Sequence, residues 1–133
     1  DRNWNVSDPE KQKKLIEELD RIIDACRKRN LPVVVGTEMN APGQKLVDDF
    51  RHPALARHLE LFLDGAALLS AHTLLGRLGR GYLSEWAKNS FSDTAEKNRF
   101  FSRFGRLVPP EKFHSIHAWP GAPEEMLALA GNR

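Results

Sequence analysis

An acidic side chain follows the most apolar short run of the sequence. The β-branched run 33–35 reads Val-Val-Val and leads into a polar loop, 36–43, that contains Glu38 and Asn40. The carboxyl ends of strands in α/β proteins face the crevice where ligands bind. Glu38 is therefore a candidate ligand for a divalent metal or a general base, and Asn40 is a candidate catalytic residue beside it. The alternative is that Glu38 caps a helix or pairs with an arginine.

His72 is the second candidate, because it lies with Ser70 and Thr73 in an otherwise apolar stretch. A neutral imidazole is a good metal ligand or general base. His72 is therefore a candidate metal ligand and catalytic residue. The alternative is a hydrogen-bonded histidine in the core, since buried polar groups need partners.

Two arginines lie among glycines in the sequence Gly-Arg-Leu-Gly-Arg-Gly over residues 76–81. Arg77 and Arg80 are candidate anchors for a substrate phosphate. The segment lacks a preceding strand and a following Lys-Ser or Lys-Thr, so it is not a P-loop. The alternative is a helix C-terminus, where glycines end the helix and arginines favour the negative end of its dipole.

The remaining candidates favour structural roles. His114 and His117 are flanked by prolines, which disfavours a shared helical face, and the spacing of His52 and His58 predicts that both are solvated. The basic and aromatic run 99–106 could bind RNA, but a helix would turn its phenylalanines inward, and a net charge of +2 disfavours nucleic acid. Cys26 falls on an apolar helical stripe and is expected to be buried.

The elements that would position these residues are mostly helical. Apolar spacing predicts a helix at 8–29, and with the buried strand at 33–35 it forms a helix–strand unit over 8–43. Region 44–133 is predicted to be helical. A helix begins at Pro53, is broken by Gly65 and continues over 66–78, and a short helix follows at 83–89. A further helix runs from the Asp93 capping box to Phe104, with Gly105 after it, and a last one runs from 123 to 131.

Composition limits the class of protein. The chain has 133 residues, enough for one domain, and its single cysteine excludes a disulfide framework. Asp64 and His72 interrupt the longest apolar stretch, and no signal peptide is visible, so we expect a cytoplasmic protein without a membrane partner. The sequence begins with Asp1 rather than Met, so we expect residues 1–133 to be a single region from the C-terminal part of a longer chain. Its partner would be the missing N-terminal part or a second copy.

The segment Val33-Val34-Val35-Gly36-Thr37-Glu38-Met39-Asn40-Ala41-Pro42-Gly43 resembles the late strand and loop of polymerase-and-histidinol-phosphatase (PHP) proteins. The resemblance implies a distorted α/β barrel that hydrolyses phosphoesters, with Glu38 as a metal ligand. The family's His-x-His segment is absent, and Ser70-Ala71-His72 only faintly matches its late Asp-x-His pair. A chain with so few ligands is expected to be inactive by itself.

Two hypotheses follow. In the first, the chain is mainly α with one short buried β-strand, an α/β fragment of a larger barrel-like domain. It would contribute Glu38, His72 and Asn40 to a metal-dependent phosphoester hydrolase, with Arg77 or Arg80 holding a small phosphorylated substrate. In the second, it is a non-catalytic helical interaction module, in which the stripe of helix 8–29 and the phenylalanines at 91, 100, 101 and 104 serve packing or a partner interface.

Overall fold

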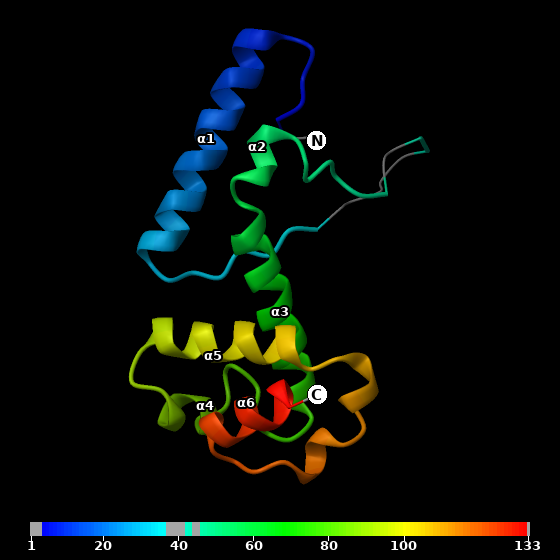
Figure 1. Ribbon diagram of the computed structural model, residues 1–133. Coiled ribbons are helices and arrows are strands. Elements are labelled where there is room, and N and C mark those ends of the chain that lie inside the picture. Colours follow the sequence, from blue (N-terminus) through cyan, green and yellow to red (C-terminus); the bar gives the residue numbers. More distant parts are fainter. Residues whose placement is uncertain (1–3, 37–41, 44–45, 133) are drawn as a thin grey trace. The chain divides into compact units, whose positions relative to one another are not determined.

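The computed structural model of the chain describes residues 4–36, 42–43 and 46–132. They form two compact units, Asp1–Phe62 and Leu63–Arg133. Figure 1 shows that the regular elements are coiled ribbons throughout. The first unit holds α1 (Pro9–Lys28), α2 (Pro53–Ala56) and the start of α3 (Leu59–Gly76). The second holds the rest of α3, α4 (Glu85–Ser90), α5 (Thr94–Leu107), the short 3₁₀ turns η1 (Pro110–Lys112) and η2 (Ile116–Ala118), and α6 (Pro123–Gly131).

The predicted strand at 33–35 is wrong, and with it the prediction of an α/β fold. The described residues contain helices and turns but no strand, and residues 31–36 form no regular element. Val34 is 53% exposed and Val35 is 37% exposed, so neither is in a core. A run of β-branched residues forms a strand when neighbouring strands supply hydrogen bonds and cover its faces. The described part of this chain supplies neither.

Helix α1 confirms the predicted helix at 8–29. Asp8 caps it, because the Asp8 carboxylate accepts hydrogen bonds from the backbone N–H groups of Glu10 and Lys11 at 3.0 and 3.1 Å. Asn30 ends it with a positive φ of 52°. The N–H of Leu31 then donates to the carbonyl of Cys26 at 2.9 Å, which completes a left-handed C-cap. Sequence capping signals therefore locate both ends of this helix.

The core of the first unit is small. Among the described residues it consists of five buried apolar side chains, Trp4, Ile23, Ala54, Leu55 and Phe62. The apolar stripe of α1 packs on it incompletely: Ile23 is 2% exposed, whereas Ile22 is 58% exposed. Cys26, which we expected to be buried, is half-buried. The first unit thus leaves part of its apolar surface uncovered.

Helix α3 runs through Gly65, where the sequence predicted a break. A glycine inside a helix costs about 0.5–1 kcal/mol relative to alanine, and packing of the buried residues at 68, 71 and 75 offsets it. The helix is long and apolar enough to cross a bilayer by length and composition, with 33% of it buried; the core helix of a soluble protein passes the same test. Its buried stripe packs into the protein, while Leu63 and Leu69 are 43% and 48% exposed.

Helix α5 begins after the predicted N-cap Asp93, but Glu96 reaches back to Ser92 rather than to the N–H of Asp93 that the predicted capping box requires. The Asp93 carboxylate accepts from the N–H of Glu96 at 2.8 Å, and the Glu96 carboxylate accepts from both the N–H and the hydroxyl of Ser92 at 2.7 Å. The two hydrogen bonds from Ser92 lower the pKa of Glu96, because they favour its charged form. The helix continues past Phe104 to Leu107 and ends before the two prolines, as expected for residues without helical N–H groups.

Gly105 is therefore inside α5 rather than after it. A Cβ atom at this position would lie 1.9 Å from the carbonyl oxygen of Ala67 in α3. No real contact is that short, so only glycine lets the two helix backbones approach this closely. The close approach extends the helix beyond the point where the sequence predicted its end.

The second unit is built around aromatic side chains. Phe101 and Phe104 are fully buried, and Phe100 is 4% exposed. The rings of Phe100 and Phe104 stack at 5.8 Å, and Tyr82 meets Phe101 edge-on at 5.2 Å. The inward packing of the phenylalanines in run 99–106, expected for a helix, is confirmed. This core also contains aliphatic residues from α3 and α6, among them Leu75 and Met126.

Candidate functional site

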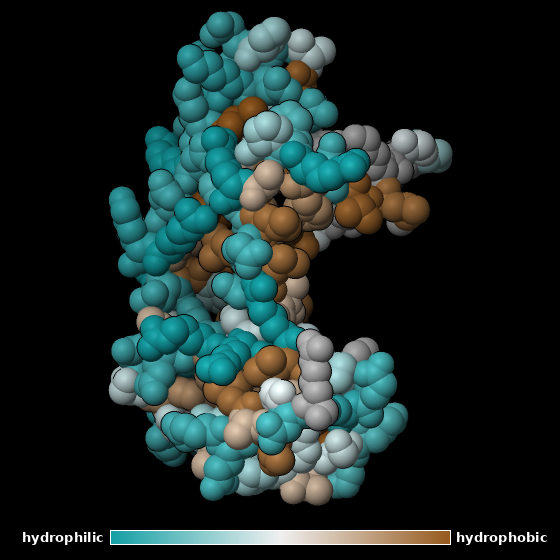
Figure 2. Space-filling view, viewed as in Figure 1, coloured by the Kyte–Doolittle hydropathy of each residue, from teal (hydrophilic) through white to brown (hydrophobic). Residues whose placement is uncertain are grey.

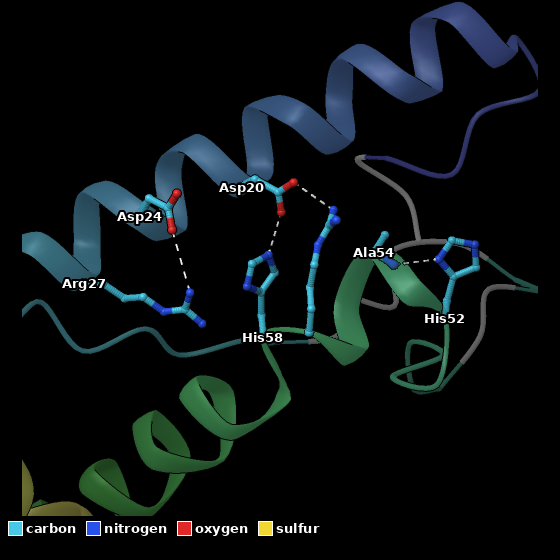
Figure 3. A network of polar contacts seen from close by, with 7 residues as sticks. Asp20, Asp24, Arg27, His52, Ala54 and His58 are labelled. Carbon is cyan, nitrogen blue, oxygen red and sulfur yellow. Dashed lines mark hydrogen bonds and ion pairs between the residues drawn. The ribbon is translucent and has the colours of Figure 1, made fainter.

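The most developed polar cluster in the first unit joins Asp20 to two consecutive residues. His58 Nε2 lies 2.7 Å from one Asp20 carboxylate oxygen, and Arg57 Nη2 lies 2.8 Å from the other. Figure 3 shows the His58 ring directed at the carboxylate of Asp20 on α1. One carboxylate thus has a cation on one oxygen and an imidazole on the other.

The sequence positions this cluster through the turn between α2 and α3. His58 lies in that turn, where its N–H donates to the carbonyl of Leu55 at 2.9 Å and its carbonyl accepts from Phe62 at 3.1 Å. Asp20 lies on α1, 38 residues away. The cluster therefore fastens α1 to the turn that begins α3.

The chemistry of this cluster is limited by burial. A carboxylate that holds one imidazole nitrogen leaves the other free to act as a base, which is the arrangement of many catalytic pairs. In this structure His58 is 4% exposed, and its Nδ1 is buried with no hydrogen-bond partner among the described residues. A substrate could not reach that nitrogen in the structure as it stands. The cluster thus has the composition of a catalytic pair and the burial of a structural one.

His52, like His58, was predicted to be solvated, but it makes contacts with neighbouring residues instead. Its Nδ1 accepts a hydrogen bond from the N–H of Ala54 at 3.1 Å and so caps α2 (Figure 3). Its ring lies 4.4 Å from that of Trp4. The prediction was wrong for both histidines. The position of His52 directly before Pro53 was the available signal, because a residue before a first-turn proline occupies the N-cap.

His72 is held by the turn that follows α3. Its Nδ1 accepts a hydrogen bond from the backbone N–H of Tyr82 at 3.0 Å, and a Cβ on Gly81 would come within 3.1 Å of the same nitrogen. This geometry agrees with the hydrogen-bonded alternative. The metal-binding and catalytic roles of His72 stay predictions, which would have to use Nε2.

Arg77 and Arg80 follow a helix C-terminus, as the alternative interpretation expected. Gly79 has a φ of +70°, and the N–H of Arg80 donates to the carbonyl of Leu75 at 2.9 Å. The Arg80 guanidinium donates to the carbonyls of Trp119 and Pro120 at 3.2 and 3.0 Å. Arg80 therefore holds the segment before α6, while Arg77 is exposed. A phosphate-binding role for either residue stays a prediction.

Glu38 and Asn40 lie outside the described residues. Across the parts of the chain that the structure does describe, no three His, Cys, Asp or Glu side chains gather closely enough to hold a metal ion. His114 and His117, expected to have surface or structural roles, are both exposed. The divalent metal therefore stays a prediction from the sequence.

Comparison with known proteins adds no assignment. No protein-family model, curated protein or solved structure gives a significant match to this chain. Function must therefore be argued from the residues themselves.

Proposed function

We propose that this chain is a non-catalytic helical protein-interaction module whose partner covers an apolar surface of the first unit. The observation that supports this is the exposure of apolar side chains on both sides of residue 40. Leu31 is 50% exposed, Val34 53% and Val35 37%, while Leu46 and Val47 are 71% and 62% exposed. All five lie within segment 31–47.

The number of exposed apolar side chains in this short segment favours a binding partner that covers them. Single exposed hydrophobic residues are common on protein surfaces and need no explanation. Here five fall within 17 consecutive positions, in a unit whose core has five buried apolar residues. Complete burial of a valine or leucine side chain stabilises by about 1.5–3 kcal/mol. Covering these exposed side chains would contribute several kcal/mol toward binding, which must also offset the entropy lost on association.

The surface view is consistent with this proposal. Figure 2 shows hydrophobic atoms at the surface of both units, so the choice of the first unit rests on the exposed apolar residues of segment 31–47. In the second unit, by contrast, aromatic side chains are buried against one another. The proposal therefore places the interface on the first unit and gives the second a self-contained core.

A photo-cross-linking experiment tests the proposal. A benzophenone amino acid is placed at Val34 or Leu46 in the cells that produce the chain, with Leu83 as the matched control. Leu46 and Leu83 are 71% and 74% exposed, but Leu83 lies in the second unit. We expect one saturable adduct from positions 34 and 46 and none from position 83. Equal cross-linking at all three positions, or none at any, would contradict the proposal.

A charge substitution then measures the interface. Leu46→Asp should weaken binding of the captured protein by at least about tenfold, which is the scale of one buried apolar contact. Leu83→Asp should leave the affinity unchanged. Calorimetric titration of both variants provides the comparison.

The metal-dependent phosphoester hydrolase is the alternative proposal, and the motif from Val33 to Gly43 is what supports it. Its test is metal content: the longest natural form of the protein should bind a divalent metal, and Glu38→Gln in that form should abolish binding, while His114→Gln should not change it. Absence of stoichiometric metal from the longest natural form of the protein would end this alternative.

A further inference from the structure

The backbone of Val33–Gly36 is unpaired. Within the described parts of the chain, none of these four residues makes a backbone hydrogen bond, whereas the N–H of neighbouring Leu31 is bonded to Cys26. A protein normally satisfies its backbone donors and acceptors with other protein groups or with water. Among the described residues, these four consecutive backbone positions have no protein partner and are available to pair with another chain.

The side chains of this segment favour pairing with a β-strand of a partner. Val33 packs on the small core of the first unit, which anchors the segment. Val34 and Val35 are exposed, and a Cβ added at Gly36 would meet no atom within 4 Å. Three successive β-branched residues have high strand propensity. The segment is thus tethered at one end and accessible along its length.

We infer that Val33–Gly36 binds by strand addition to the open edge of a β-sheet in a partner protein. This inference rests on the proposed interaction function and specifies its mode. The partner's edge would supply the missing hydrogen bonds, and its sheet would accommodate the valine side chains.

A sheet-containing partner fits better than a second copy of this chain. Pairing two copies would produce an isolated two-stranded ribbon, which is marginally stable in water. The valines also do not alternate with polar residues, a pattern typical of strands covered on both faces. A partner whose sheet is covered by other elements provides that cover, and the described part of this chain has no strand to offer.

Strand addition predicts that only every second residue of the segment hydrogen-bonds to the partner. Along a strand, backbone N–H groups of alternate residues point to the same side. Only one of the pairs 33/35 and 34/36 can therefore face the partner. Val34→Pro and Val35→Pro each remove one N–H, so one of them should weaken binding by at least about tenfold while the other is tolerated, because proline is accepted on the open side of an edge strand.

The direct test uses a cyclic β-hairpin peptide as the probe, with N-methylated amides along one edge and free amides along the other. The control is the same hairpin N-methylated on both edges. In ¹⁵N NMR titrations of the full chain, the open-edge hairpin should shift the amides of residues 33–36 and slow hydrogen exchange at alternate ones. Shifts of equal size with both hairpins, or none with either, would overturn the inference, as would protection of these amides by self-association without a probe.

Failure of this inference can be distinguished from failure of the proposed function. If the cross-linked partner binds Val34→Pro and Val35→Pro as tightly as the unsubstituted chain, while Leu46→Asp weakens it, the module binds through side chains and strand addition is wrong. If positions 34 and 46 capture no partner, the proposed interaction function fails, and the strand mode that rests on it fails with it, whatever the hairpin shows.

Discussion

The two units of this chain differ in how many of their apolar side chains they bury. The second unit buries twelve residues in one cluster, including three phenylalanines from α5. The first buries five and leaves Ile22, Val34 and Leu46 each more than half exposed. Polar burial is also less complete in the first unit, where the buried His58 has one ring nitrogen without a hydrogen-bond partner among the described residues.

This difference indicates which unit depends on a partner. A small core provides little stability against the entropy of folding, so an incomplete one is commonly supplemented by association. Among the described residues the second unit has the larger core, and we expect it to be the more stable of the two. The following predictions test that comparison.

The largest expected effect is in the aromatic core of the second unit. Phe104 is fully buried, so Phe104→Ala should destabilise this unit by about 3–5 kcal/mol through lost burial and a residual cavity. Leu129→Ala is the control, since Leu129 is 40% exposed. Denaturant unfolding followed by tryptophan fluorescence measures both. Similar losses for the two variants would mean that this core is loosely packed.

The next effect concerns the close approach of α3 and α5. Gly105→Ala places a Cβ against the backbone of Ala67, which cannot move as a flexible side chain would, so a loss of at least about 2 kcal/mol is expected. Gly131→Ala provides the control, because its Cβ would meet Leu107 at an ordinary 4.0 Å. If thermal unfolding shows the two variants to be equally stable, the helices cross with more space than the structure shows.

A smaller effect is expected in the first unit. Asp20→Ala leaves the buried His58 Nε2 without its acceptor and should cost about 1–3 kcal/mol. Asp24→Ala removes an exposed pair with Arg27 at 3.7 Å and should change stability by less than about 0.5 kcal/mol. Hydrogen exchange of α1 amides reports this unit separately. Equal exchange in both variants would show that the cluster does not fasten α1.

The smallest effect is electrostatic and depends on pH. The folded pKa of Glu96 is lowered below its ordinary 4.5 by hydrogen bonds from Ser92, so its contribution is present above 4.5 and is lost as pH falls through the folded pKa. Glu96→Gln should therefore remove part of the acid-induced loss of α5 stability. Side-chain NMR titration should give a Glu96 pKa below 4.5, and a value above it would contradict the hydrogen-bonded geometry.

Local signals in the sequence predicted much of the helical structure. Apolar spacing identified α1 and Asp93 identified the start of α5, because helical periodicity and N-capping act over a few residues. The structural alternatives for Arg80 and His72 were likewise weighed from the sequence. The site residues Glu38 and Asn40 stay untested predictions.

The errors involve interactions between distant residues. Val33–Val35 has strand propensity, but a strand also needs neighbours that sequence periodicity does not supply. Gly105 resembles a helix end until Ala67, 38 positions earlier, is seen against it. His58 is paired with a carboxylate at the same separation. Local patterns therefore could not reveal the roles of these residues.

Tyr82 offers an optical consequence. It is the single tyrosine of the chain, its hydroxyl donates to Asn98 at 2.6 Å, and Lys97 Nζ lies 4.3 Å from the centre of its ring. Burial raises its pKa, since the phenolate is poorly solvated there. An alkaline titration that follows the phenolate absorbance band would thus report on the structure around Tyr82 without an added label. The midpoint of the titration would shift toward that of free tyrosine whenever the surrounding helices open.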